Sequence, residues 1–140
     1  MDIQGYEMPE DLYYDEHHFW VRVEGDMLTM GMDAFAQKLA GDIAYVQLPF
    51  EGKKLTAGKK FAKVESGKWV GKVFAPVDGE LVSSNEALES NPGLINRDCY
   101  GDGWMYKIRA SAIGDVEKLI HGEAAVTQKL LEDIEKYETT

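Results

Sequence analysis

The sequence predicts a mainly β protein that ends in helices, and two observations support this fold class. Short runs of β-branched and aromatic residues follow one another closely, with Gly-rich turns between them. Such spacing is typical of a sandwich or barrel rather than of βαβ units. From Ile113 onward the apolar residues recur at helical spacing instead. We therefore expect one domain, residues 1–140, with a β core at about 12–110 and C-terminal helices at about 113–138.

The first part of the chain is expected to form a β-hairpin and a short helix. The segment up to Asp11 is polar, and we expect it to be irregular. The hairpin strands are predicted at 19–24 and 27–30, joined by a Gly-Asp turn. Residues 32–39 suit a helix, with Asp33 near its N-cap and Gly41 at its end.

The remaining elements continue the β pattern and then change to helices. The predicted strands are 42–48, 61–66, 69–74, 80–84 and 104–109, with a helical turn at 86–89. The first C-terminal apolar stripe is Val116, Leu119 and Ile120; the second is Leu130, Leu131, Ile134 and Tyr137. The second stripe has acids on its opposite face, and we expect two helices packed on the β core.

Composition limits the classes of function. The chain has 25 acids against 15 lysines and arginines, a net charge of −10, which argues against nucleic acid or an anionic membrane as partner. The single cysteine, Cys99, cannot form an internal disulfide, which agrees with a reducing compartment. The chain has no apolar run long enough to span a bilayer, and its start lacks a signal-peptide pattern. We expect a cytoplasmic protein.

The chain shows no recognisable catalytic pattern. Nucleophile-elbow, Walker and dinucleotide motifs are absent, and Cys99 has no histidine near it in sequence. His17 and His18 are neighbours that would point to opposite faces of a strand, so they do not form a metal clamp. We expect no catalytic residue and no metal site, which favours a binding or carrier module over an enzyme.

One hairpin carries an exposed lysine. Residues 64–70 read Val-Glu-Ser-Gly-Lys-Trp-Val, which places Lys68 at a tight turn between two β-rich runs. An amine at such a tip is accessible to a modifying enzyme, and an acyl group on it becomes a mobile tether. Gly67 removes an obstructing side chain and permits positive φ. Lys63 and Lys72 lie nearby, so the pattern alone does not select the lysine.

Six separated stretches, in order, resemble the H-protein of the glycine cleavage system. They are Trp-Val-Arg-Val-Glu-Gly-Asp at 20–26, Gly-Asp-Ile-Ala-Tyr-Val-Gln-Leu-Pro at 41–49, Val-Glu-Ser-Gly-Lys at 64–68, Ala-Pro-Val-Asp-Gly-Glu at 75–80, Asn-Glu-Ala-Leu-Glu-Ser-Asn-Pro at 85–92 and Tyr-Gly-Asp-Gly-Trp at 100–104. The resemblance implies a barrel-sandwich hybrid of two antiparallel sheets with C-terminal helices. It also implies lipoate in amide linkage on Lys68, flanked by Glu65, Ser66, Gly67 and Trp69. A biotinyl carrier would instead have a methionine on each side of its lysine.

The chain departs from this family around the expected arm. The family usually has an acid at the position of Phe19, two small residues at Trp69 and Val70, and an acid at Lys72. The resemblance implies that these acids line the cleft for an arm loaded with an aminomethyl group. Because a protonated amine is stabilised by carboxylates, Phe19 and Lys72 make the predicted cleft poorly suited to that cargo.

With these departures, the chain resembles the lipoate-binding proteins of heterodisulfide-reductase-like sulfur oxidation. Our first expectation is a non-catalytic lipoyl shuttle that carries a sulfur-containing intermediate on Lys68. The first alternative is the glycine cleavage H-protein with its aminomethyl cargo, and the second is an unlipoylated relay or structural homologue.

The resemblance also implies partners. They are lipoate ligase or lipoyl-assembly enzymes, and either the heterodisulfide-reductase-like complex or the P-, T- and L-proteins of glycine cleavage. We expect the acidic surface to attract partners with basic docking faces.

Overall fold

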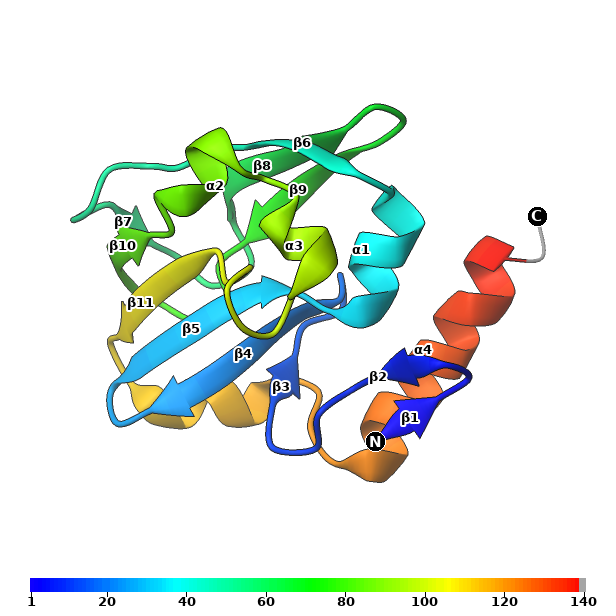
Figure 1. Ribbon diagram of the computed structural model, residues 1–140. Helices are drawn as coiled ribbons and strands as arrows, with labels where there is room; N and C mark the ends of the chain where they lie inside the picture. Colours follow the sequence, from blue (N-terminus) through cyan, green and yellow to red (C-terminus); the bar gives the residue numbers. More distant parts are fainter. Residues whose placement is uncertain (139–140) are drawn as a thin grey trace.

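The computed structural model describes residues 1–138, which form two main antiparallel sheets and a small N-terminal hairpin (Figure 1). The six-stranded sheet runs β3 (Tyr13–Tyr14), β4 (Phe19–Glu24), β5 (Met27–Met32), β11 (Tyr106–Ala110), β10 (Gly79–Ser84) and β7 (Lys54–Leu55). The three-stranded sheet runs β6 (Ile43–Val46), β8 (Lys60–Ser66) and β9 (Val70–Phe74). The N-terminal hairpin consists of β1 (Asp2–Ile3) and β2 (Tyr6–Glu7). The predicted fold class, mainly β with C-terminal helices, is confirmed.

Five helical segments connect or cover the sheets. They are α1 (Ala34–Ala40), α2 (Ala87–Ser90), α3 (Leu94–Arg97), the 3₁₀ helix η1 (Ile113–Lys118) and α4 (Glu123–Glu138) among the described residues 1–138. Helix α1 begins as predicted, because the Asp33 carboxylate accepts a hydrogen bond from the backbone N–H of Ala36 at 2.8 Å. It ends at Gly41, whose φ of 79° is unfavourable for any residue with a side chain.

Two apolar clusters hold these elements together. The larger cluster is formed by both main sheets and includes Val21, Leu28, Val64 and Leu81. The smaller one is where α4 and the N-terminal hairpin pack on the rest of the molecule, and it contains Trp20, Phe35, Val126 and Leu130, among others. Because these side chains leave water, burial fixes α4 beside the start of β4 and α1.

The structure corrects several predicted elements. The N-terminal segment is not irregular, since β1 and β2 pair within it. The two-residue strands β3 and β7 and helix α3 were not predicted, because elements this short depend on their partners rather than on a local pattern. The strand predicted at 42–48 spans only Ile43–Val46, and the first C-terminal helix is a 3₁₀ helix. Within residues 1–138, the helices are too short or too polar to cross a membrane.

Candidate functional site

Lys68 lies at the bend between β8 and β9. The N–H of Ser66 donates to the carbonyl of Trp69 at 2.8 Å, which closes the bend over two residues, Gly67 and Lys68. The N–H of Lys68 also donates to the Ser66 hydroxyl at 3.3 Å. The Lys68 side chain is exposed, and none of the ion pairs found among residues 1–138 includes it. The amine is therefore free for an attaching enzyme to approach.

The structure distinguishes Lys68 from the two nearby lysines. Lys63 and Lys72 lie directly opposite each other in the middle of the paired strands. The Lys63 ammonium is paired with Glu65 at 3.3 Å. Only Lys68, of these three, occupies the tip of the hairpin, where a tether has room to move.

The stem of Lys68 rests against the end of helix α1. A Cβ atom on Gly41 would lie 3.1 Å from Cε of Lys68 and 3.7 Å from its Nζ. Gly41 thus has two roles, because it ends α1 at positive φ and leaves space beside the lysine stem.

Gly67 was expected to allow a positive φ in the bend, and the structure does not have one there. Gly67 does not have positive φ, so the bend does not require glycine for its backbone conformation. A Cβ atom there would meet nothing within 4 Å. The open space around Gly67 agrees with an accessible lysine, but a small side chain would leave it accessible too.

A cleft of about 580 Å³ lies beside the hairpin, and Trp69, the residue after Lys68, is one of the residues that line it. Its walls come from the edge strand β9, the start of β4, helix α1 and helix α4. The predicted cleft residues Phe19 and Lys72 line it together with Trp69. The structure therefore brings together the three positions at which the sequence departs most clearly from the family.

These three residues contribute differently to the cleft. Phe19 is only 2% exposed and belongs mainly to the larger core cluster, so it offers little surface to a cargo. Trp69 is half-buried, and its ring lies across Gly71, where a Cβ atom would be 1.9 Å from Cη2. Gly71 therefore lets the indole lie flat on β9 as a wall of the cleft. Lys72 is exposed on the same strand.

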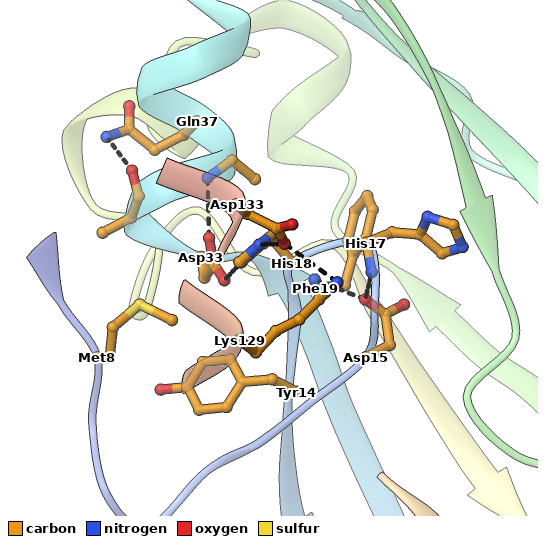
Figure 2. A network of polar contacts seen from close by, with 12 residues as sticks. Met8, Tyr14, Asp15, His17, His18, Phe19, Asp33, Gln37, Lys129 and Asp133 are labelled. Carbon is orange, nitrogen blue, oxygen red and sulfur yellow. Dashed lines mark hydrogen bonds and ion pairs between the residues drawn. The ribbon is translucent and has the colours of Figure 1, made fainter. Parts of the chain in front are cut away.

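His18 and Asp133, which line the cleft, belong to a buried polar network that was not predicted (Figure 2). Nδ1 of His18 lies 2.9 Å from Oδ2 of Asp33, and Nε2 lies 2.6 Å from Oδ2 of Asp133. The same Asp133 oxygen is 3.1 Å from Nζ of Lys129. His18 precedes β4 and has φ of 67°, so it is not a strand neighbour of His17 as the sequence suggested. The network joins α4 to the start of β4 and to α1.

Burial and hydrogen bonds shift the pKa values of His18, Asp33 and Asp133. Burial opposes the protonated imidazole, but hydrogen bonds and charges from Asp33 and Asp133 outweigh it, so the pKa of His18 lies above 6.5. Complete burial raises the pKa of Asp33. Burial also acts to raise the pKa of Asp133, but the bonds from His18 and Lys129 lower it below its ordinary value. A protonated His18 can donate to both carboxylates.

The other titratable groups considered from sequence have structural roles. Ring nitrogen Nδ1 of His121 lies 3.1 Å from the carbonyl of Leu12, and its ring stacks on Tyr13. Burial raises the pKa of the Cys99 thiol to about 12, which leaves it unreactive near neutral pH. The part of the chain that the structure describes has no cluster of three or more His, Cys, Asp or Glu able to hold a metal.

A β-sandwich body with an exposed lysine at a hairpin bend, beside a cleft, defines a carrier of the lipoyl type. The family model described as glycine cleavage H-protein matches residues 12–133. The chain belongs to this family, whose members are non-catalytic carriers with lipoate covalently attached to a lysine.

Individual relatives agree with the family assignment. The glycine cleavage system H protein of Bacteroides fragilis is 41% identical over 115 residues, 82% of this chain and 91% of that protein. The probable H protein of Haloarcula marismortui is 44% identical over 120 residues, 86% and 94% of the two chains. The crystal structure of the Mycobacterium marinum H protein superposes with a TM-score of 0.71 at 34% identity, covering 75% of this chain and 87% of that one.

Proposed function

We propose that this protein is the lipoyl carrier of a glycine cleavage system, with lipoate amide-linked to Lys68 and an aminomethyl group as cargo. The observation that carries the proposal is the exposed, unpaired lysine at the bend of the Glu-Ser-Gly-Lys hairpin, within residues 1–138. The curated relatives that the chain resembles include a glycine cleavage H protein and two probable glycine cleavage H proteins. The proposed partners are lipoate ligase or a lipoyl-assembly enzyme and the P-, T- and L-proteins.

The residues around Lys68 fit a lipoyl arm. Lys68 supplies the amide nitrogen, and Glu65, Ser66 and Gly67 form the accessible hairpin that an attaching enzyme must recognise. A cleft of about 580 Å³ lies in the range that holds small ligands. When bound, lipoate supplies a dithiolane whose sulfurs form and break bonds with substrates. Trp69 and Tyr137 offer aromatic walls to such an apolar arm.

Among the described residues, two acids line the cleft. Its acids are Glu16, which is 3.3 Å from His17, and Asp133, which already contacts His18 and Lys129. An aminomethyl-loaded arm would meet Asp133 as the carboxylate least exposed to water. Other members of the family usually have acids at positions 19 and 72, where this chain has Phe19 and Lys72. We therefore propose that Asp133 stabilises the protonated amine of the cargo in their place.

A second candidate, the sulfur-oxidation shuttle that we first expected, is favoured by one observation. Lys72, Lys129 and Lys136 all line the cleft, and this excess of positive charge suits an anionic sulfur group better than an amine. The partner would then be a heterodisulfide-reductase-like complex. The comparisons support the glycine cleavage reading instead, and the cytoplasmic location stays a prediction.

Loading of the lipoylated chain separates the two candidates. The P-protein with glycine is expected to aminomethylate the chain, which mass spectrometry detects on Lys68. Lys72→Asp is expected to raise the loading rate, since it replaces an ammonium that repels the amine by a carboxylate that attracts it. The matched control is Lys54→Asp, an exposed lysine outside the cleft. Absence of loading in the parent chain, together with loading of a standard H-protein in the same assay, would refute the glycine cleavage proposal.

A further inference from the structure

The positive charge of this acidic protein is concentrated in one segment. Residues 52–77 contain seven lysines and a single acid, Glu65, whereas the rest of the chain has 24 acids against eight lysines and arginines. The seven lysines are Lys53, Lys54, Lys59, Lys60, Lys63, Lys68 and Lys72. The segment contains β7 and the whole β8–β9 hairpin, so the charge surrounds the proposed attachment residue.

Most of this charge is exposed and uncompensated. Six of the seven lysines are exposed, and Lys63 is half-buried. Within residues 1–138, Lys63 is the only one of them in an ion pair, with the single acid of the segment. Lys63 and Lys72 also lie directly opposite each other across the two strands. Like charges in this position destabilise a sheet.

Apolar side chains lie among these lysines on the same face. Tyr45 and Val70 are both register partners of Glu65, so the three side chains form one row across β6, β8 and β9. Tyr45 is 47% exposed and Val70 is 64% exposed. An apolar centre with a polar rim is the usual anatomy of a protein–protein interface. We call the surface formed by Tyr45, Lys63, Val70 and Lys72 the hairpin face.

We propose that the hairpin face is the docking surface for the enzyme that attaches lipoate, and that this enzyme meets it with an acidic surface. The inference rests on the proposed function, because it takes Lys68 as the attachment residue. An attaching enzyme must bring its active site to Nζ of the bare lysine. Other partners act at the far end of the arm and have less need to touch the hairpin.

The geometry sets which lysines the enzyme covers. A typical interface covers about 800 Å² on each partner, a patch of roughly 16 Å radius. At about 3.3 Å per residue along a strand, Lys63 and Lys72 lie roughly 13–17 Å from the bend and fall within that patch. Lys53 and Lys54 belong to another strand, β7, and would contribute only through the longer-range field. The acidic overall charge of the chain predicted partners with basic docking faces. For lipoate attachment we propose the opposite, an enzyme with an acidic docking face.

The test is lipoylation of the full unmodified chain by a lipoate ligase with ATP and free lipoate, followed by intact mass. Lys63→Glu with Lys72→Glu replaces the like-charged pair by another and also removes the Lys63–Glu65 ion pair. Lys72→Glu alone keeps that ion pair and faces Lys63 with the opposite charge, so it is the second variant. The control is Lys107→Glu with Arg109→Glu on strand β11 of the other sheet, which changes the net charge equally. Thermal unfolding checks the fold of each variant.

At an ionic strength of about 0.01 M, where the screening length is about 30 Å, the double variant is expected to lose about tenfold or more in kcat/KM. The control should remain within about twofold, and the difference should shrink at about 1 M salt, where the screening length is about 3 Å. An equal loss in variant and control would overturn the docking proposal, while the parent would still be lipoylated. No lipoylation of Lys68 in the parent would refute the proposed function instead.

Two other occupants of the hairpin face are outcomes of the same experiment. If a mixed-sequence single-stranded oligonucleotide binds the parent but not the double variant, and lipoylation is unchanged, the face binds nucleic acid and the proposal is wrong. If sedimentation shows the parent but not the double variant as an oligomer, with lipoylation unchanged, the face binds a second copy and the proposal is also wrong.

Discussion

Nε2 of His18 lies 2.6 Å from Oδ2 of Asp133, although the two residues are 115 positions apart in sequence. His18 immediately precedes the first residue of β4, and Asp133 belongs to the C-terminal helix α4. Since both residues line the cleft, their contact fixes α4 as one of its walls. The position of this wall therefore depends on this buried pair and on the apolar contacts of α4, among them those of Val126 and Leu130.

Asp133→Ala is expected to loosen α4 without unfolding the sheets. Removing one partner leaves His18 buried without its second acceptor, at a cost of about 1–3 kcal/mol. Hydrogen exchange should show faster exchange of amides in α4 and unchanged protection in β4 and β5. Glu132→Ala, at the exposed neighbouring position of the same helix, is the matched control. Equal exchange in α4 for both variants would show that the contact does not hold the helix.

The same contact is expected to weaken as pH rises. Because the pKa of His18 is raised in the folded protein, its contribution is complete below the unfolded value of about 6.5. It is lost as pH rises through the higher folded value. Asp33 acts in the same direction, since burial raises its pKa, whereas the contribution of Asp133 is lost only in acid. Lys129 is the remaining charged group paired with Asp133.

Hydrogen exchange of α4, divided by the intrinsic rate at each pH, measures this dependence. Protection in the parent should fall as pH rises above about 6.5, and Asp133→Asn should flatten the curve. A parent curve that is already flat over this range would contradict the assigned direction of the His18 shift.

Asp15→Asn is expected to stabilise the protein above acidic pH. One oxygen of Asp15 accepts the N–H groups of His17 and Phe19, both at 2.9 Å, and asparagine preserves this acceptor. Burial raises the pKa of Asp15 to about 6 in spite of these bonds. The folded state therefore disfavours the ionised form, and asparagine removes that cost.

The gain from Asp15→Asn should grow between about pH 4 and pH 6 and then stay constant, at on the order of 1–3 kcal/mol. Chemical denaturation at several pH values measures it. Asp11→Asn, at an exposed position of the same segment, is the control. A gain that does not change with pH would mean that the charge of Asp15 is not its source.

Gly71→Ala is expected to displace the Trp69 indole from the wall of the cleft. The added Cβ atom would lie 1.9 Å from the ring, so either the ring or the strand must move, at about 1–3 kcal/mol. The fluorescence of Trp69, isolated by subtracting the Trp69→Phe spectrum, should shift to longer wavelength. Gly67→Ala is the control, because a Cβ atom there meets open space. An unshifted Trp69 spectrum in Gly71→Ala would contradict the described packing.

The elements with strong local patterns could be predicted from sequence, and those that depend on tertiary partners could not. Asp33 and Gly41 mark the ends of α1 by local capping chemistry, and the hairpin around Lys68 is defined by its turn residues. Strands β1 and β2 have only two residues each, which is too short for an alternation of apolar and polar residues to be recognised in the sequence. Family resemblance, rather than local pattern, selected Lys68 over Lys63 and Lys72.

The candidate site was predictable only in part. Phe19, Trp69 and Lys72 were expected near the arm, and the structure places all three around one cleft. The network of His18, Asp33 and Asp133 could not be found from sequence, because no local pattern links residues 115 positions apart. The charge asymmetry was visible in the sequence, since seven lysines fall within 52–77, but the net charge of −10 concealed it.

The most direct test of the central claim is the mass of the intact protein from a host that can attach lipoate. The parent chain should gain the mass of one lipoyl group, and peptide mapping should place it on Lys68. Lys68→Arg keeps the positive charge of the hairpin and should remain unmodified. A parent chain without the added mass, or with the lipoyl group on Lys63 or Lys72, would contradict the account.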